Sequence, residues 1–312
     1  MLEMQEIFPD YYPDFSCSAE RCQHNCCIGW EIDIDEETLL TYQNIGGCLG
    51  KRLQENISLD DTPHFNLLKN DRCPFLNERN LCDLILELGE DHLCQICTDH
   101  PRFRNFLPDR VEIGVGLCCE EAGRLILGKK EPVRLLGSNS LTDDEIILLR
   151  DQVILILQDR SLPISARIEE MLHLCGAELP NKSLTEWSDF FIRLERLNED
   201  WTELLQLMQS SEIDHEGFNA HMKDRQTEYE QLLVYLVYRH MANAMDEIDL
   251  ASRAAFAALG CLIVYSLGAI LWTKNRSFTF EDQVELARQF SAEIEYSEEN
   301  MDTLLDALII MK

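Results

Sequence analysis

The stretch AAFAALGCLIVYSLGAILW, residues 254–272, is a run of 19 residues without a charged side chain. Its length is just enough for one membrane-spanning helix. However, Gly260, Ser266 and Gly268 interrupt it, and basic residues flank both ends, so the flanks set no clear orientation across a bilayer. A helix that is apolar on all sides also suits the centre of a bundle. We therefore predict a buried central helix and no membrane insertion.

Helical periodicity continues on both sides of this stretch. Thr142 or Asp143 is suited to cap one helix, and Thr279, followed by acidic residues, is suited to cap another. The expected helices cover residues 143–160, 164–174, 184–209, 224–244, 251–274 and 280–311. From residue 136 to residue 312 the sequence therefore predicts a bundle of five or six helices with short connections.

Residues 1–135 have shorter apolar runs and more turn residues. Residues 30–34 (WEIDI) alternate apolar and acidic side chains, which indicates a short strand. A helix capped by Asp35 should follow over residues 35–42, and a strand over residues 111–117 should precede a helix over residues 120–127.

The predicted class is therefore mainly α. We expect an irregular N-terminal cysteine-cluster region with a few short strands, residues 1–135, packed on the C-terminal helical bundle, residues 136–312.

The charge balance narrows the range of partners. With 27 basic and 57 acidic residues, the formal net charge is −30, which argues against nucleic acid because phosphates require Lys and Arg. The negative charge either attracts a basic protein partner or only keeps the protein soluble. The first ten residues, MLEMQEIFPD, lack the apolar core of a signal peptide, so we expect a cytoplasmic protein.

The cysteines are the strongest chemical signal. Thirteen are present, and in a reducing compartment such clusters bind metal more often than they form disulfides. Eleven fall between residues 17 and 119: Cys17, Cys22, Cys26, Cys27, Cys48, Cys73, Cys82, Cys94, Cys97, Cys118 and Cys119. Soft thiolates at these spacings suit zinc or an iron–sulfur cluster, and spacing alone does not separate the two. We read Cys48, Cys175 and Cys261 as ordinary buried thiols.

Several motifs occur in a recognisable order. After Cys-x4-Cys-x3-Cys-Cys come CPFL (73–76), NLC (80–82), LCQIC (93–97), HPR (100–102) and LCCEEA (117–122), and later EQLLVYLVYR (230–239) and LARQFSAEIEYSEEN (286–300). In this order the chain resembles the flagellin lysine-N-methylases, which are related to zinc- or iron-chelating cysteine-cluster proteins. The resemblance covers most of the chain and is weaker toward the C-terminus.

This resemblance implies methyl transfer from S-adenosylmethionine to lysines of flagellin, and a 4Fe–4S cluster held by cysteines, with zinc as the alternative metal. The matching cysteines are Cys17, Cys22, Cys26, Cys27, Cys73, Cys82, Cys94, Cys97 and Cys119. Nine candidates exceed the four ligands of one cluster, so either some are structural or a second metal is bound. Cys118 stands where the family tends to have serine, and we regard it as incidental.

Two common signatures of methyl-transfer enzymes are missing. The radical motif Cys-x3-Cys-x2-Cys starts at Cys22 and Cys26, but Gly29 stands at its third position, and no Rossmann fingerprint is present. Gly114 and Gly116 are more typical of turns or close contacts than of a nucleotide loop.

We therefore favour polar transfer over a radical route, since a neutral lysine amine is already nucleophilic. A carboxylate or tyrosine suits this chemistry. The candidate catalytic residues are Glu295, Tyr296 and Tyr238, with Glu293, Tyr235 and Arg239 close to them in sequence. The alternative is a non-enzymatic adaptor that binds zinc or an iron–sulfur cluster and captures a basic protein.

Overall fold

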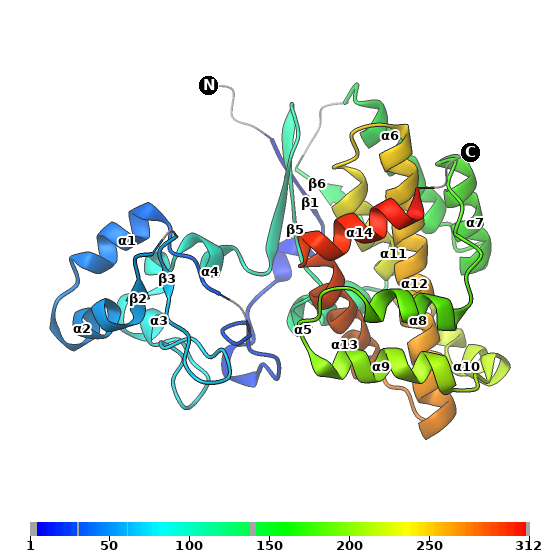
Figure 1. The fold of residues 1–312 in the computed structure, drawn as a ribbon. Helices are drawn as coiled ribbons and strands as arrows, with labels where there is room; N and C mark the ends of the chain where they lie inside the picture. The colour runs from blue at the N-terminus through cyan, green and yellow to red at the C-terminus, as the bar shows by residue number, and fades with distance from the viewer. Residues whose placement is uncertain (1–4, 30, 61, 138–141, 310–312) are drawn as a thin grey trace. The chain divides into compact units, whose positions relative to one another are not determined.

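The computed structural model describes residues 5–29, 31–60, 62–137 and 142–309 (Figure 1). The chain forms two compact units. The cysteine unit is Ser16–Arg102, and the helical unit combines Met1–Phe15 with Phe103–Lys312. These bounds differ from the predicted regions 1–135 and 136–312, because the first strand of the chain pairs with a strand that follows residue 109.

Helices dominate the helical unit, and the described strands of the chain are few and short, so the predicted mainly α class is confirmed. The α-helices of the helical unit are α5 (Glu120–Leu127), α6 (Glu145–Leu157), α7 (Ile164–Leu174), α8 (Leu184–Ile192), α9 (Glu199–Ser210), α10 (His215–His221), α11 (Gln226–Met241), α12 (Glu247–Asn275), α13 (Phe280–Phe290) and α14 (Glu298–Leu308).

The long helix α12 lies in the core of this unit, next to α11 (Figure 1). Its length and composition alone would allow it to cross a membrane, and 83% of its most apolar window is buried inside the protein. Gly260 allows α12 to pack closely against Phe290, because a Cβ at this position would lie 3.0 Å from the Phe290 ring. The predicted buried helix is confirmed.

A four-stranded sheet flanks these helices, in the order β4 (Arg102–Phe106), β5 (Arg110–Val115), β1 (Gln5–Pro9) and β6 (Leu135–Leu136). β1 pairs parallel to β5 and antiparallel to β6. All six residues of β5 are buried, which is typical of a strand covered on both faces. The strand predicted over residues 111–117 is present as β5 with shifted bounds, and the helix predicted over residues 120–127 is confirmed as α5.

Two predicted long helices are broken. Residues 184–209 form α8 and α9 with a loop between them, and α9 restarts at Asn198, whose side chain accepts from Asp200 N–H. Residues 280–311 form α13, a π-helical turn at Ser291–Glu295, and α14, which begins after Ser297. The predicted N-cap of α6, Thr142 or Asp143, is also wrong, because Asp144 caps this helix. The cap at Thr279 is confirmed.

The cysteine unit has little regular structure. It contains α1 (Glu36–Gln43), α2 (Gly47–Asn56), β2 (Ile57–Ser58), β3 (His64–Phe65), α3 (Asp83–Leu88) and α4 (Gln95–Asp99). Asp35 caps α1 as predicted, accepting from Thr38 N–H. The strand predicted over residues 30–34 is wrong: Trp30 lies outside the described residues, and Asp33 makes only an isolated bridge with His64. A separate small core, which includes Cys73 and Cys94, holds this unit together.

Candidate functional site

A group of buried polar side chains lies inside the helical unit. Tyr235, Arg239 and His240 come from α11, and Glu295 comes from the π-helical turn after α13. π-helical turns occur frequently at functional sites. Tyr296 follows this turn directly. We call these five residues the Glu295 network.

The carboxylate of Glu295 is the centre of this network. His240 Nε2 donates to Oε1 at 2.6 Å, and the Tyr235 hydroxyl donates to the same oxygen at 3.1 Å. Arg239 Nη1 lies 3.5 Å from Oε1 and donates to the Tyr235 oxygen at 2.6 Å. The backbone N–H of Leu117 also donates to Tyr235, at 3.1 Å. Because a carboxylate only accepts, Nε2 of His240 must carry the hydrogen in this arrangement.

The electrostatics of the network keep Glu295 ionised. Burial alone would raise its pKa, but the charge of Arg239 and the hydrogen bond from His240 outweigh burial and lower the pKa to about 2. Burial likewise lowers the pKa of His240, despite the neighbouring carboxylate. The network at neutral pH is therefore a buried Arg239–Glu295 ion pair with a neutral His240 and a protonated Tyr235.

Tyr296 forms the accessible edge of the network, since 40% of the residue is exposed. Its hydroxyl faces Gly116, where a Cβ would lie 2.1 Å from the hydroxyl oxygen and 3.0 Å from Arg239 Nη1. The guanidinium of Arg239 lies 4.6 Å from the centroid of the Tyr296 ring. The close contacts predicted for Gly116 are therefore confirmed, and only glycine leaves room for this tyrosine.

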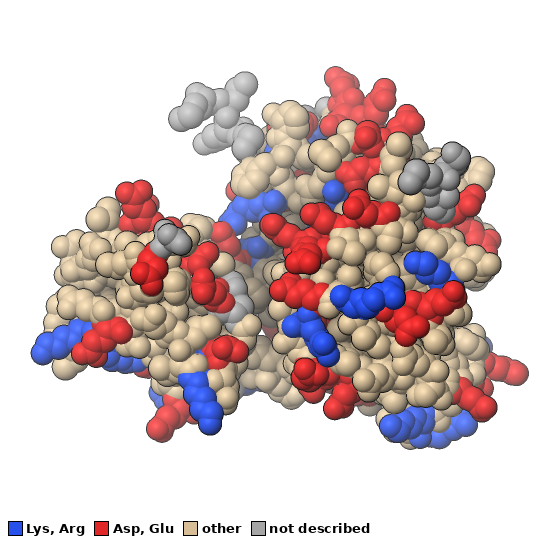
Figure 2. Space-filling view, viewed as in Figure 1, with Lys and Arg blue, Asp and Glu red and all other residues tan. Residues whose placement is uncertain are grey.

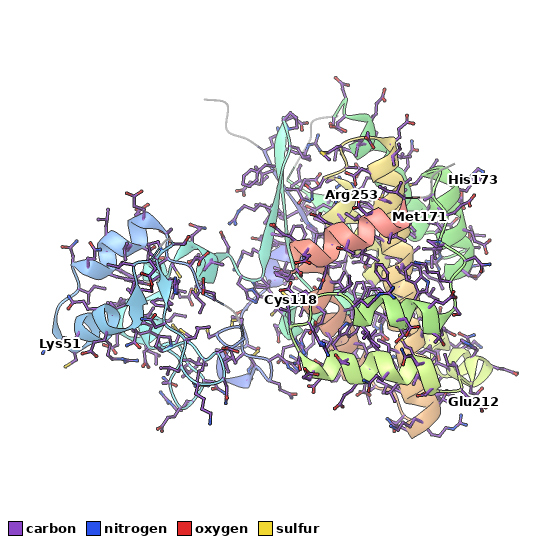
Figure 3. The ribbon with its side chains drawn as sticks, in the orientation of Figure 1. Lys51, Cys118, Met171, His173, Glu212 and Arg253 are labelled. Carbon is purple, nitrogen blue, oxygen red and sulfur yellow. The ribbon has the colours of Figure 1, made fainter. Side chains whose placement is uncertain are left out.

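The Tyr296 hydroxyl also hydrogen-bonds the thiol of Cys118, which is labelled in Figure 3. Burial raises the pKa of Cys118 to about 12, although the tyrosine and the charge of Arg239 act in the opposite direction. This thiol is therefore protonated at neutral pH and serves as a polar neighbour of the tyrosine.

Tyr238, the third candidate, has other partners. Its hydroxyl lies 3.0 Å from the backbone oxygen of Ile7 and 3.1 Å from that of Ile113. These oxygens belong to the paired strands β1 and β5, and the tyrosine is 1% exposed. Tyr238 thus ties α11 to the sheet, whereas Glu295 and Tyr296 lie in one network.

A second set of contacts fixes the turn that carries Glu295. Asn300, fully buried, donates to the backbone oxygens of Glu293 at 2.7 Å and Glu195 at 2.9 Å, and accepts from Glu195 N–H at 2.8 Å. Glu293 accepts from Leu197 N–H at 3.0 Å, and Ser297 donates to the Glu195 carboxylate at 2.7 Å. These hydrogen bonds hold the loop between α8 and α9 against the π-helical turn that separates α13 from α14. These contacts explain why both predicted long helices are interrupted.

Sequence reasoning found part of this network. Glu295, Tyr296, Tyr235 and Arg239 stood in motifs, and the four-residue spacing of Tyr235 and Arg239 places them on one helix face. It missed His240, which directly follows Arg239. The only signal for His240 was its position next to the motif that ends at Arg239, since its partner Glu295 lies 55 residues away in sequence.

The cysteine unit contains eight of the nine predicted metal ligands. Five of them, Cys27, Cys73, Cys82, Cys94 and Cys97, belong to its core or pack against it. The Cys94 and Cys97 sulfurs are 3.3 Å apart, and Cys73 N–H donates to the backbone oxygen of Cys27 at 2.9 Å. Segments far apart in sequence are thus drawn together.

These thiols also influence one another electrostatically. The hydrogen bond with Cys94 raises the pKa of Cys97, as do burial and the charges of Cys94, Cys27 and Cys73. The hydrogen bond with Cys27 lowers the pKa of Cys26 to about 7. Gathered soft sulfur donors match the chemistry of zinc and iron–sulfur centres. Yet within the described part of the chain, no three Cys, His, Asp or Glu side chains converge closely enough to form a ready metal site.

The other cysteines have different surroundings. Cys17 is exposed, and its sulfur accepts from Ala19 N–H, whereas the Cys22 thiol donates to the backbone oxygen of His24. Cys119 belongs to the helical unit, where it stands at the N-cap of α5. Cys175 and Cys261 are buried as predicted, but the prediction for Cys48 was wrong, because this thiol is exposed on α2.

Comparison with known proteins links the helical unit to a family. Residues 177–310 match the model of the FliB lysine N-methylase C-terminal domain. This part of the chain is therefore similar to the C-terminal domain of the FliB lysine N-methylases. This FliB-family segment contains α11, the π-helical turn and α14, so it includes all five residues of the Glu295 network.

Individual relatives agree with this assignment. The flagellar biosynthetic protein FliU of Salmonella muenchen is 28% identical over 154 residues, which cover 47% of this chain and 91% of FliU. The lysine-N-methylases of Salmonella choleraesuis (strain SC-B67) and Salmonella typhimurium (strain LT2) are each 28% identical over 142 residues, 43% of this chain. The match spans only 35% of the length of these two methylases. No solved structure matches this chain.

Proposed function

We propose that this protein is a protein-lysine N-methyltransferase that acts in the cytoplasm on flagellin, with S-adenosylmethionine as the methyl donor. The observation that carries this proposal is the FliB-family match, because it contains the whole Glu295 network. The names of the relatives, two lysine-N-methylases and one flagellar biosynthetic protein, support the substrate class.

We assign different roles in the reaction to the residues of the Glu295 network. S-adenosylmethionine would supply an electrophilic methyl group, and a neutral lysine amine is the nucleophile: the N–C bond forms as the C–S bond breaks, and S-adenosylhomocysteine leaves. Glu295 is a weak base, because its pKa is about 2 and all of its partners are already in place. We therefore assign it an electrostatic role: it balances Arg239 and fixes the orientation of Tyr235 and His240.

Tyr296 is the member of the network that can meet a substrate, because it is 40% exposed. Although part of the residue is exposed, its hydroxyl is enclosed beside Gly116 and Cys118, and this burial raises its pKa well above the usual range of tyrosine, so the hydroxyl stays protonated. A hydroxyl oxygen can still accept an N–H hydrogen bond and orient the lone pair of an amine toward the methyl group. The proton released by the lysine then passes to water. Tyr238 has a structural role in this proposal.

We further propose that thiolates of the cysteine unit hold a 4Fe–4S cluster, with zinc as the alternative. The residues in position to contribute are those gathered around the small core: Cys26, Cys27, Cys73, Cys82, Cys94 and Cys97. When bound, the metal centre would join segments that the chain itself connects only loosely. Cys17, Cys22 and Cys119 remain candidates by resemblance.

The test is anaerobic purification with iron, sulfide and zinc analysis, followed by incubation with S-adenosylmethionine and flagellin. We expect stepwise methyl mass gains on flagellin lysines, without stoichiometric 5′-deoxyadenosine. Appearance of 5′-deoxyadenosine would replace the polar route by a radical one. A zinc-containing protein that binds flagellin without methylating it would favour the non-enzymatic adaptor.

A further inference from the structure

A shallow groove lies between α9, α12 and α13 in the helical unit, with a volume of about 300 Å³. Its floor is apolar, and every charged side chain that lines it is acidic. The leucines are Leu204, Leu207, Leu271 and Leu286, and the acids are Asp200, Glu203, Asp282 and Glu285. None of these residues belongs to the Glu295 network.

The four acids are not equivalent. Asp282 accepts from the backbone and hydroxyl of Thr279 in the cap of α13, and Glu285 pairs with Arg288 at 2.8 Å. Asp200 and Glu203 are exposed on the first turns of α9. Neither of these two has an ion-pair partner among the residues that the structure describes. The outer side of the groove therefore carries two carboxylates whose charge is available to a ligand.

Gln289 also lines the groove. Its Nε2 donates to Glu285 at 2.6 Å, while its Oε1 is buried and has no hydrogen-bond partner in the described part of the protein. The groove thus offers exposed carboxylates and an apolar floor, and no basic side chain lines it. Carboxylates bind a cation and leucines pack against an alkyl chain, so the groove suits a ligand that has a positive charge at the end of an apolar chain.

We propose that this groove is a docking site for a lysine side chain of the protein substrate, separate from the lysine that is methylated. The methylene stem of lysine would lie along the leucines, and its ammonium would reach Asp200 and Glu203. The volume is sufficient for one long side chain, and the net charge of −30 favours approach of a basic segment. This inference rests on the proposed function, since it assumes a lysine-bearing protein partner.

The experiment measures binding alone. A fluorescein-labelled leucine–lysine peptide is titrated with the full-length protein, and fluorescence anisotropy gives the Kd. The double variant Asp200→Asn, Glu203→Gln should weaken binding by about five- to tenfold, as expected for two exposed charge contacts. The matched control is Glu169→Gln, Glu170→Gln on the exposed side of α7, which removes the same net charge. It should change the Kd by less than about twofold.

Two further probes separate the site from general charge attraction. The same peptide with every lysine acetylated should lose binding to the wild-type protein, and Leu207→Ser should weaken binding of the lysine form. Equal weakening by both double variants would show that only the net charge acts, and would overturn the proposal. Unchanged binding by the Asp200, Glu203 variant would overturn it as well.

Failure of the proposed function would look different. If the wild-type protein binds the peptide in the groove but transfers no methyl group to flagellin, the docking site stands and the enzyme assignment falls. If transfer occurs but the Asp200, Glu203 variant keeps the wild-type KM for flagellin, the enzyme assignment stands and the docking site falls.

Discussion

Buried ionisable side chains have different partners in the helical unit and in the cysteine unit. In the helical unit, the buried charge of Glu295 is balanced by Arg239 and bonded to His240 and Tyr235. In the cysteine unit, buried thiols such as Cys73 and Cys94 lie near other thiols that raise or lower their pKa. The first unit thus balances the charge of Glu295 with its own residues. The second gathers thiols, the donor type that zinc and iron–sulfur centres bind, and the proposed metal centre would use them.

The surface charge does not follow this division. Figure 2 shows acidic side chains on the visible face of both units, where they outnumber the basic ones. The difference between the units therefore lies in their interiors.

The largest expected effect concerns the cysteine unit. Cys27→Ser should remove bound metal and also abolish hydrogen-exchange protection over Ser16–Arg102, because metal binding and folding are coupled in such small cores. Protection in the helical unit should remain. Hydrogen exchange with mass spectrometry measures both units in one experiment.

The control for this variant is Cys48→Ser, which changes an exposed thiol on α2. It should leave metal content and protection unchanged. If Cys27→Ser kept its full metal content, Cys27 would leave the ligand list, and loss of protection in both units would contradict their independence.

The next largest effect concerns the ion pair of the helical unit. Glu295→Gln leaves the Arg239 charge buried without its counterion, and should lower the free energy of unfolding by about 3–5 kcal/mol. Denaturant titration measures this change. Asp302→Asn, an exposed change on α14, should have an effect close to zero.

The same comparison has a defined pH dependence. Because folding lowers the pKa of Glu295 from 4.5 to about 2, its contribution is complete above pH 4.5 and disappears as the pH falls toward 2. The difference in unfolding free energy between wild type and Glu295→Gln should therefore shrink by roughly 3 kcal/mol over this interval. A difference that is constant with pH would contradict the ionised, paired state.

A smaller effect is expected where the two broken helices meet. Asn300→Ala removes three hydrogen bonds of a buried side chain and should cost about 2–3 kcal/mol. Because the turn that carries Glu295 is then less fixed, kcat for methyl transfer should fall while KM for flagellin stays unchanged. Asn300→Asp should not restore activity, since it lacks the donor to Glu293.

The surface change Asn219→Ala is the control, because among the described residues the Asn219 side chain has one hydrogen bond, which it accepts from the Tyr265 hydroxyl. If Asn300→Ala lowered stability but left kcat at the wild-type value, the contact would be structural and without influence on the site.

The smallest structural change tests the fit of Tyr296. Gly116→Ala places a methyl group where the Tyr296 hydroxyl lies and should cost about 1–2 kcal/mol, with loss of most methyl transfer. Gly46→Ala in the cysteine unit adds the same group in open space and should be neutral. Full activity of Gly116→Ala would show that the tyrosine does not need its position beside Gly116.

Sequence reasoning succeeded where local patterns decide the structure. The bounds of α7, the cap at Thr279 and the burial of α12 follow from periodicity, capping chemistry and apolar length. It failed where distant contacts compete with periodicity. Asn300 and Glu293 bind the loop near Glu195, and this tertiary contact ends helices that the apolar pattern alone would continue.

The candidate site was predictable to a similar degree. Glu295 and Tyr296 stood in a motif, but the pairing of Glu295 with His240 depends on how α11 meets the π-helical turn. Strand β1 was missed because it pairs with β5, a parallel partner more than a hundred residues away. No local pattern reports such a distance.

The central claim is that the Glu295 network, with Tyr296 at its accessible edge, is the site of lysine methyl transfer. The most direct test compares Tyr296→Phe with Tyr265→Phe, which removes a hydroxyl bonded to Asn219 instead. Mass spectrometry of flagellin incubated with S-adenosylmethionine and each variant gives the rate of methylation. We predict a loss of about tenfold to a hundredfold for Tyr296→Phe and none for Tyr265→Phe, with both proteins folded. Equal, wild-type rates for the two variants would contradict the claim.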